Sequence, residues 1–255
     1  MKINYHTHTT RCHHAAGTER EYVEAAIERG IKTLGFADHT PYCFPEGYYS
    51  GFRMRPEETA EYAATVLELR DRYSESIEIR LGVEMEYYPE HFADTLSLLR
   101  EHQVEYLILG QHFLGNEYRQ PYCGSPTTDT ERLRRYCHQV MDAMNTGLFT
   151  YLAHPDLLNF HGDEQVYRQL MKEICREARA CGIPLEINLL GLGENRHYPR
   201  NAFWECAVEE GCKAILGCDA HTPEGLLDVK TEARALALAK QWNITVLDDV
   251  PLRRI

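Results

Sequence analysis

The chain has 255 residues, with 39 acidic and 27 basic side chains, so its formal net charge is −12. Hydrophobic residues make up 44% and charged residues 26%, a balance typical of globular proteins that excludes a largely disordered chain. The negative charge argues against broad binding to a nucleic-acid backbone, but it does not exclude a small anionic substrate at one site.

The cysteines and the apolar runs predict a cell compartment. Nine cysteines contain no CxxC pair, and their odd number fits neither a secreted disulfide framework nor a cysteine zinc knuckle. No apolar run approaches the ~20 residues needed to cross a bilayer, and the first residues show no signal-peptide apolar region. We expect a reduced, cytoplasmic protein with no membrane or nucleic-acid partner, and the sequence leaves its oligomeric state open.

Short apolar runs of strand length recur along the chain, and a segment with helical periodicity separates each run from the next. Thr18 with Glu21 predicts a capping box before the first helix, and Thr128 with Glu131 repeats the pattern. Seven strand–helix repeats without a Ser/Gly/Pro-rich linker predict one α/β domain with a parallel sheet. The predicted strands cover residues 3–6, 33–37, 77–84, 106–111, 150–153, 185–189 and 214–218.

Histidines and acids gather at the carboxyl ends of these strands. In a (β/α) barrel those ends converge on the face that carries the active site, which favours a closed barrel over an open sheet. A single histidine there is more often a satisfied polar group, but the whole set indicates a multinuclear metal site. The residues, in chain order, are His6, His8, His13, His14, Asp38, His39, Glu84, Glu86, His112, His154, Asp156, Asp219 and His221.

The motifs resemble a known family. The series His6-x-His8, Asp38-His39, Glu84, His112, His154 and Asp219-x-His221 resembles the PHP (polymerase and histidinol phosphatase) superfamily over essentially the whole chain, in motif order. The stretches HTHTTRCHH, SGFRMRPEE, EYLILGQHF and EINLLGLGENRHYP look closest to the histidinol-phosphatase branch. One departure is that His13 precedes His14 where the family has proline. Either histidine could be the ligand, and we favour His14 because it keeps the family's spacing from His6.

The resemblance implies a fold and a ligand set: a distorted (β/α)7 barrel, one PHP-type metallophosphatase domain over residues 1–255, holding three divalent ions of zinc, iron or manganese. Mostly imidazole ligands suit these metals better than magnesium or calcium. Asp38 could orient a ligand histidine or point away. Carried over position by position, one ion would be held by His6, His8, Glu84 and Asp219, a second by Glu84, His112 and His154, and a third by His14, His39 and His221.

The implied activity is hydrolysis of a phosphomonoester, most specifically of L-histidinol phosphate in histidine biosynthesis. A metal-bridging hydroxide would attack phosphorus, with Glu84, Asp219 and His221 as catalytic residues. The chain has neither a GxSxG motif nor a Cx5R motif, in agreement with a reaction that needs no nucleophilic side chain.

Substrate selection is expected from the loops. A loop arginine is usually solvated, but arginine also offers a two-pronged fork for phosphate, and an acid could meet a cationic amine. The candidates are Arg53, Glu117 and Arg196.

Other functions are compatible with the same motifs. Within the superfamily these are a phosphotyrosine-protein phosphatase, a nucleotide phosphoesterase and another small-molecule phosphatase. The net charge of −12 and the lack of a basic stripe weigh against oligonucleotides. A non-catalytic metal-binding regulatory protein is the remaining alternative, and the complete ligand series weighs against it.

Overall fold

Strands and helices alternate along the chain, as the apolar pattern predicts. The computed structural model describes residues 1–45 and 48–255. Its strands form one parallel sheet in chain order. The eighth strand lies beyond the last of the seven predicted runs and was not predicted. The strands are β1 (Ile3–Asn4), β2 (Thr33–His39), β3 (Glu78–Met85), β4 (Tyr106–Leu109), β5 (Phe149–Leu152), β6 (Leu185–Asn188), β7 (Lys213–Gly217) and β8 (Thr245–Val246).

The sheet curls until its first and seventh strands approach each other at their carboxyl ends. Thr7 and Ala220, just beyond β1 and β7, form an isolated parallel bridge, and the N–H of His8 donates to the carbonyl of Ala220 at 2.9 Å. At the other end of β7, Lys213 pairs with Thr245 of β8. The expected distorted α/β barrel is therefore confirmed, as a curled sheet of eight parallel strands where the resemblance implied seven.

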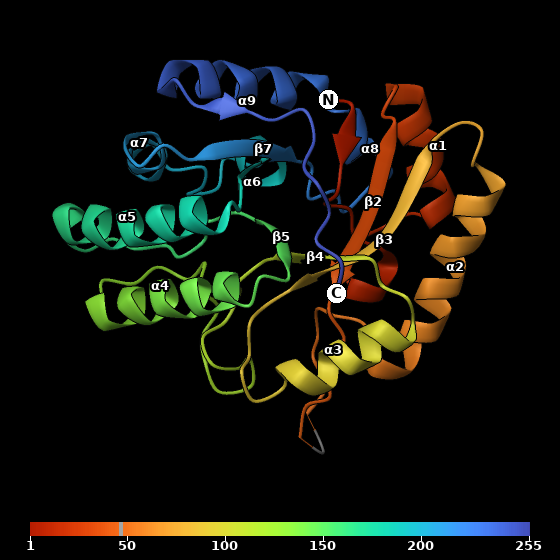
Figure 1. Ribbon diagram of the computed structural model, residues 1–255, viewed down its shortest axis with the longest axis horizontal. Helices are drawn as coiled ribbons and strands as arrows, with labels where there is room; N and C mark the ends of the chain where they lie inside the picture. Colours follow the sequence, from red (N-terminus) through yellow and green to blue (C-terminus); the bar gives the residue numbers. More distant parts are fainter. Residues whose placement is uncertain (46–47) are drawn as a thin grey trace.

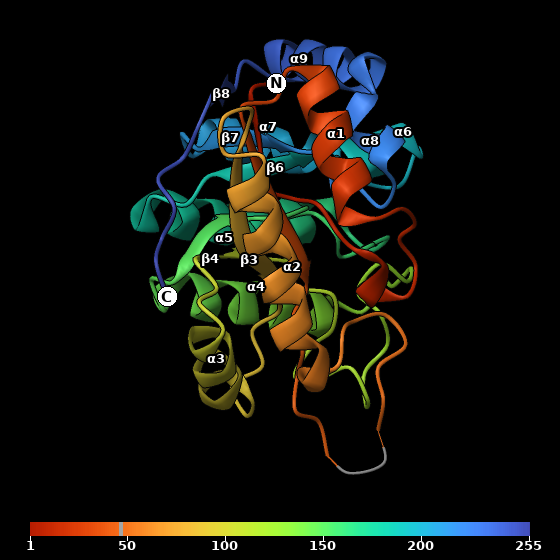
Figure 2. The ribbon, with the colours of Figure 1, turned by 90° about the vertical axis from the view of Figure 1, so that its right-hand side faces the viewer.

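Helices cover the outside of the curled sheet (Figures 1 and 2). Helix α4 packs beside α5, and α5 beside α7. No helix in the described part of the chain is long and apolar enough to cross a membrane. The helices are η1 (Thr10–Cys12), α1 (Glu19–Arg29), η2 (Pro56–Glu58), α2 (Thr59–Arg72), α3 (Phe92–Glu101), α4 (Thr130–Asn145), α5 (Glu164–Cys181), α6 (Leu189–Gly193), α7 (Asn201–Glu209), α8 (Pro223–Leu227) and α9 (Val229–Trp242).

The two predicted capping boxes have different outcomes. The box at α1 is confirmed: Thr18 accepts from the N–H of Glu21, and the Glu21 carboxylate accepts from the N–H of Thr18 at 2.6 Å. At α4 the prediction was wrong, because the N-cap is Asp129 rather than Thr128. The Asp129 carboxylate accepts a hydrogen bond from the N–H of Glu131 at 2.9 Å. Aspartate is among the strongest N-cap residues, so it takes the position directly before the helix.

Apolar side chains fill the barrel below the carboxyl ends of the strands. Gly35 and Gly82 make room for the ring of Tyr106, since a Cβ at Gly82 would lie 2.3 Å from it. The Tyr106 hydroxyl lies 2.9 Å from the carbonyl oxygen of Tyr5, so its polar end is satisfied. We call this cluster the barrel plug; it consists of Tyr5, Ala37, Tyr106, Ile108, Tyr151, Ala153, Ile215 and Val250. A site in the barrel must therefore lie above the plug.

Candidate metal centre

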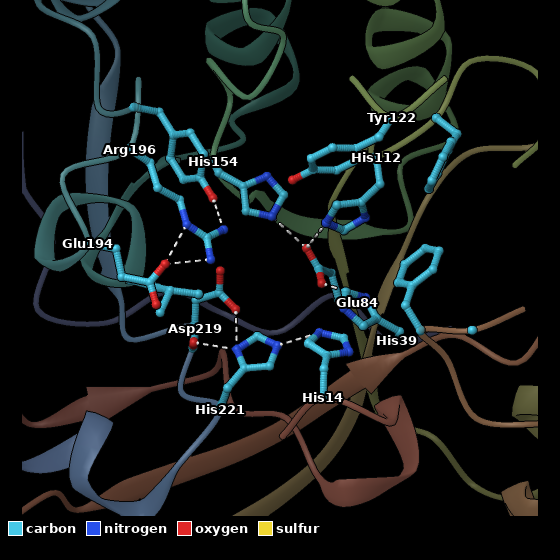
Figure 3. A pocket seen from close by; sticks show the side chains of 15 residues that line it. His14, His39, Glu84, His112, Tyr122, His154, Glu194, Arg196, Asp219 and His221 are labelled. Carbon is cyan, nitrogen blue, oxygen red and sulfur yellow. Dashed lines mark hydrogen bonds and ion pairs between the residues drawn. The ribbon is translucent and has the colours of Figure 1, made fainter. Parts of the chain in front are cut away.

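The carboxyl ends of the strands bring histidines and acids into one pocket above the barrel plug (Figure 3). The pocket has a volume of about 490 Å³. His39 and Glu84 lie on strands β2 and β3, whereas the other polar residues lie just beyond a strand end. Residues of six strands or strand ends thus meet here: His6 and His8, His39, Glu84, His112, His154, and Asp219 with His221.

Four buried side chains form the deepest group. The Nε2 atom of His6 lies 3.5 Å from Glu84 Oε2 and 3.4 Å from Asp219 Oδ1. The Nε2 atom of His8 lies 3.6 Å and 3.0 Å from the same two oxygens. All four atoms therefore face a shared point between two imidazoles and two carboxylates.

This group fits a divalent cation. Zinc bonds to nitrogen and oxygen of about 2.0–2.2 Å place tetrahedral ligand atoms roughly 3.3–3.6 Å apart. Three of the four distances just given lie in this range. His6 Nε2, His8 Nε2 and Glu84 Oε2 are buried and make no hydrogen bond within the described residues. Buried polar atoms without a partner are costly, and a shared cation would satisfy all three.

The other oxygen of Glu84 faces a second group. His154 Nε2 lies 2.8 Å and His112 Nε2 3.5 Å from Glu84 Oε1. A carboxylate that presents one oxygen to each of two imidazole groups has the arrangement of a bridging ligand. The set that the resemblance implied for two ions is therefore brought together by β1, β3 and the ends of β4, β5 and β7.

A third group lies nearer the surface. His14, His39 and His221 present ring nitrogens within 4.8 Å of one another, and the Nε2 atoms of His14 and His221 are 3.0 Å apart. His13 is exposed and ends η1 with a φ of 66°. Of the two alternatives that the sequence left open, His14 is the one that reaches the pocket.

Electrostatics prepare these groups to bind a cation. Burial lowers the pKa of His221 to about 3 and that of His39 well below its usual value, so both rings are neutral at pH 7 and offer a lone pair. Burial by itself would raise the pKa of Glu84, but the surrounding imidazoles, His112 first, hold it well below its usual range. For His8, burial by itself would lower the pKa, but the carboxylates of Asp219 and Asp38 outweigh it and raise the pKa to about 9. A proton and a cation therefore compete at His8.

Three further carboxylates lie behind the candidate ligand histidines. Glu186 Oε1 is 2.7 Å from Nδ1 of His6, and Glu86 Oε1 is 2.9 Å from Nδ1 of His112. Asp38 lies behind His8 at 3.5 Å, without a hydrogen bond to that ring. A carboxylate on Nδ1 fixes the tautomer and leaves Nε2 free for a metal.

Glu86 was expected at the metal site without a specific role, and Glu186 was not predicted to be there. Glu86 stands two residues after Glu84, and alternate residues of a strand point to the same side, which is a usable signal. Glu186 lies inside β6, in a run read only as apolar. Its carboxylate fills the space beside Gly217, where a Cβ would lie 1.7 Å from Glu186 Oε1.

The three candidate substrate residues lie in different places. Arg196 lines the pocket, where its guanidinium contacts Glu194 at 2.7 Å and the hydroxyl of Tyr198 at 2.9 Å. Arg53 and Glu117 are buried, 2% and 6% exposed, and form an ion pair at 2.6 Å. Neither of them is among the described residues that line this pocket, and Arg53 is enclosed by Glu86 and Glu117 from two other segments.

Aromatic side chains complete the wall of the pocket. Phe52 and Tyr122 pack against His112, with ring centres 5.9 and 6.3 Å apart, and Phe113 packs against Phe52. In Figure 3, Tyr122 and His112 lie opposite Glu194 and Arg196. Phe52 packs edge-on against His39, with ring centres 5.0 Å apart. The pocket therefore has an aromatic side and a charged side, with the candidate metal ligands at its base.

Comparisons with known proteins agree with this geometry. A family model described as "PHP domain" matches residues 4–189. The chain is 30% identical over 233 residues to a probable histidinol-phosphatase of Deinococcus radiodurans, a match covering 86% of this chain and 85% of the relative. It is 25% identical over 252 residues to a probable histidinol-phosphatase of Schizosaccharomyces pombe, covering 88% and 81%.

A solved structure has the same fold. A histidinol phosphate phosphatase from Lactococcus lactis, crystallised with zinc, L-histidinol and phosphate, superimposes with a TM-score of 0.75 and 20% identity. The match covers 96% of this chain and 95% of the other. At that identity it supports the fold alone.

Proposed function

The chain belongs to the PHP domain family, and from that premise we propose that it is a metal-dependent phosphomonoesterase whose substrate is L-histidinol phosphate. The observation that carries the proposal is that His6 Nε2, His8 Nε2 and Glu84 Oε2 face one another above the barrel plug, buried and with no hydrogen bond within the described residues. The names of the Deinococcus and Schizosaccharomyces relatives and the ligands in the Lactococcus crystal favour this substrate.

We assign three divalent cations to the three groups of side chains, with zinc, iron or manganese as the metals that imidazole-rich ligand sets select. Bound there, the cations would supply a water acidified for attack at neutral pH and positive charge for the phosphoryl oxygens. The protein's own contribution is to hold the ligands. Glu84 presents one oxygen to each of two groups, and Asp219 with His221 completes the wall on the side of β7.

The substrate would lie between the two sides of the pocket. Among the described residues that line the pocket, Arg196 is the one arginine or lysine, so it is the group we assign to the phosphate. Its present partner Glu194 is the acid we assign to the ammonium of the substrate. The imidazole of the substrate would then face the aromatic side, where Phe52 and Tyr122 offer ring faces and edges.

We place the metallophosphatase domain over residues 1–255. The family model ends at residue 189, but Asp219 and His221 lie beyond that point and face the same pocket. The bridge between Thr7 and Ala220 also joins the end of β7 to the first motif. These contacts support including the last quarter of the chain in the same unit.

A panel of substrates tests the proposal. The purified protein, with its metals determined by elemental analysis, is assayed for phosphate release from L-histidinol phosphate, a phosphotyrosine peptide and nucleoside monophosphates. We expect kcat/KM for histidinol phosphate to exceed the others by at least about 100-fold, or ~2.7 kcal/mol of transition-state binding. Comparable rates on another substrate would refute this substrate but keep the phosphoesterase class. Bound metal without turnover of any substrate would favour a regulatory protein.

A further inference from the structure

Arg53 is a fully buried cation whose five N–H donors are all used. Its side chain is 1% exposed, so every donor must find its partner within the protein. Two donors face Glu117, two face Glu86 and one faces the carbonyl of Thr40. The donor–acceptor distances are 2.8 and 2.6 Å to Glu117, 3.1 and 2.8 Å to Glu86, and 2.9 Å to Thr40.

Glu86 carries this constraint to the metal centre. Both of its oxygens accept from Arg53, which fixes the plane of the carboxylate, and Oε1 also accepts from Nδ1 of His112 at 2.9 Å. With Nδ1 donating, Nε2 of His112 keeps its lone pair and points toward Glu84. Without Arg53, the Glu86 carboxylate would lose two hydrogen bonds that fix its orientation, and His112 would no longer face an acceptor in a fixed position.

The same arginine joins this ligand to the aromatic side of the pocket. Its guanidinium carbon lies 4.3 Å from the ring centre of the adjacent Phe52 and 5.2 Å from that of Tyr42. Glu117, on its other side, accepts from the hydroxyl of Tyr48 at 3.0 Å. Segments after β2, at the end of β3 and after β4 therefore meet at one cation.

We propose that Arg53 is a positioning residue for the metal centre, which fixes the ring of His112 through Glu86 and so determines how tightly the ion shared by His112 and His154 is held. The inference rests on the proposed function, because that function makes His112 a ligand. It also explains why an arginine in this segment is buried. Glu86 and Glu117 lie on two sides of it, and a guanidinium, with its planar fork, can donate hydrogen bonds to both carboxylates at once.

The test compares metal retention in matched variants. Arg53→Met removes the charge and all donors but keeps an unbranched chain as long as the arginine side chain up to Nε. Arg53→Lys keeps the charge, and Arg168→Met makes the same change at a surface ion pair on α5. Each purified holoenzyme is dialysed against graded chelator, and its metals per chain are counted by elemental analysis. Thermal unfolding, KM and kcat for histidinol phosphate are measured on the same samples.

We expect Arg53→Met to lose one ion at about 10- to 100-fold lower chelator concentration than the wild type, while the other ions stay. The kcat of Arg53→Met falls when that ion is lost. Arg53→Lys should retain metal at a level between those of the wild type and Arg53→Met, and Arg168→Met should match the wild type in metal retention and kcat. If Arg53→Met fails to fold, the double variant Arg53→Met/Glu117→Gln leaves one buried acid fewer, and we expect the same selective loss from it.

Two results would overturn the inference. One is a wild type that binds metal and turns over substrate while Arg53→Met, or the double variant, keeps every ion at the same chelator concentration. The other is loss of all ions together with the fold in both Arg53→Met and the double variant, which would make Arg53 merely structural. A wild type without metal or phosphatase activity is a different result, since it contradicts the proposed function itself.

Discussion

Replacing Glu84 with glutamine is the most direct test of the proposed metal centre. One oxygen of Glu84 lies 3.0 Å from Nδ1 of His39 and faces the His6–His8 group, while the other lies 2.8 Å from Nε2 of His154. An amide of the same shape presents an oxygen to only one of these groups and an NH2 to the other. Glu84→Gln therefore removes one ligand outright and the negative charge from the second.

The size of the effect follows from this geometry. Losing a residue that only supports a ligand lowers metal affinity by about 10- to 100-fold, so losing a direct ligand sets about 100-fold, or ~2.7 kcal/mol, as a lower bound. We expect Glu84→Gln to retain at least one ion fewer and its kcat for histidinol phosphate to fall at least 100-fold. The assays are elemental analysis and phosphate release.

A control on the same strand separates this effect from damage to the sheet. Glu78→Gln makes the same change at the exposed start of β3, beside Arg80, and should leave metals and turnover unchanged. A Glu84→Gln protein with the full metal content and wild-type kcat would refute the bridging role.

The remaining predictions concern the supports and the substrate. Glu186→Gln weakens the acceptor behind His6, so its metal affinity should fall about 10-fold in the chelator titration, and an unchanged affinity would leave Glu186 without a role. Arg196→Met should raise KM for histidinol phosphate roughly 10-fold, the value of a charge-assisted hydrogen bond, with its metals retained; an unchanged KM would exclude Arg196 from the phosphate site. Gly217→Ala should lower the free energy of unfolding by about 1–3 kcal/mol, because its Cβ collides with Glu186; a thermal melt equal to the wild type would contradict that collision.

The meeting of these histidines in one pocket could be predicted because the signal for most of them is local. Most stand at the end of an apolar run or a few residues after it, and parallel strands bring their carboxyl ends to one edge. The choice between His13 and His14 depends on the turn after η1, where His13 takes the left-handed conformation and sends His14 toward His221. Spacing alone favoured His14, but only the backbone shows why.

The role of Arg53 could not be read from the sequence, because its environment is assembled from three segments. The sequence around an arginine in a loop is the same whether its side chain is exposed to solvent or buried among acids. The two acids that enclose it, Glu86 and Glu117, lie 33 and 64 residues further along the chain. Burial of a charge is decided by such long-range pairs, and a single sequence contains no local pattern for them.

The barrel plug has a consequence for how a catalytic cycle in this pocket would end. The ring of Tyr106 and its neighbours block the barrel axis under the candidate metal ligands, so substrate and both products would have to enter and leave on the side of the pocket that faces away from the plug. If the proposed cations hold the phosphoryl group at the base of the pocket, the alcohol would leave first and inorganic phosphate last. Phosphate should then act as a competitive product inhibitor, because the form of the protein that retains it is the form that the next substrate must enter.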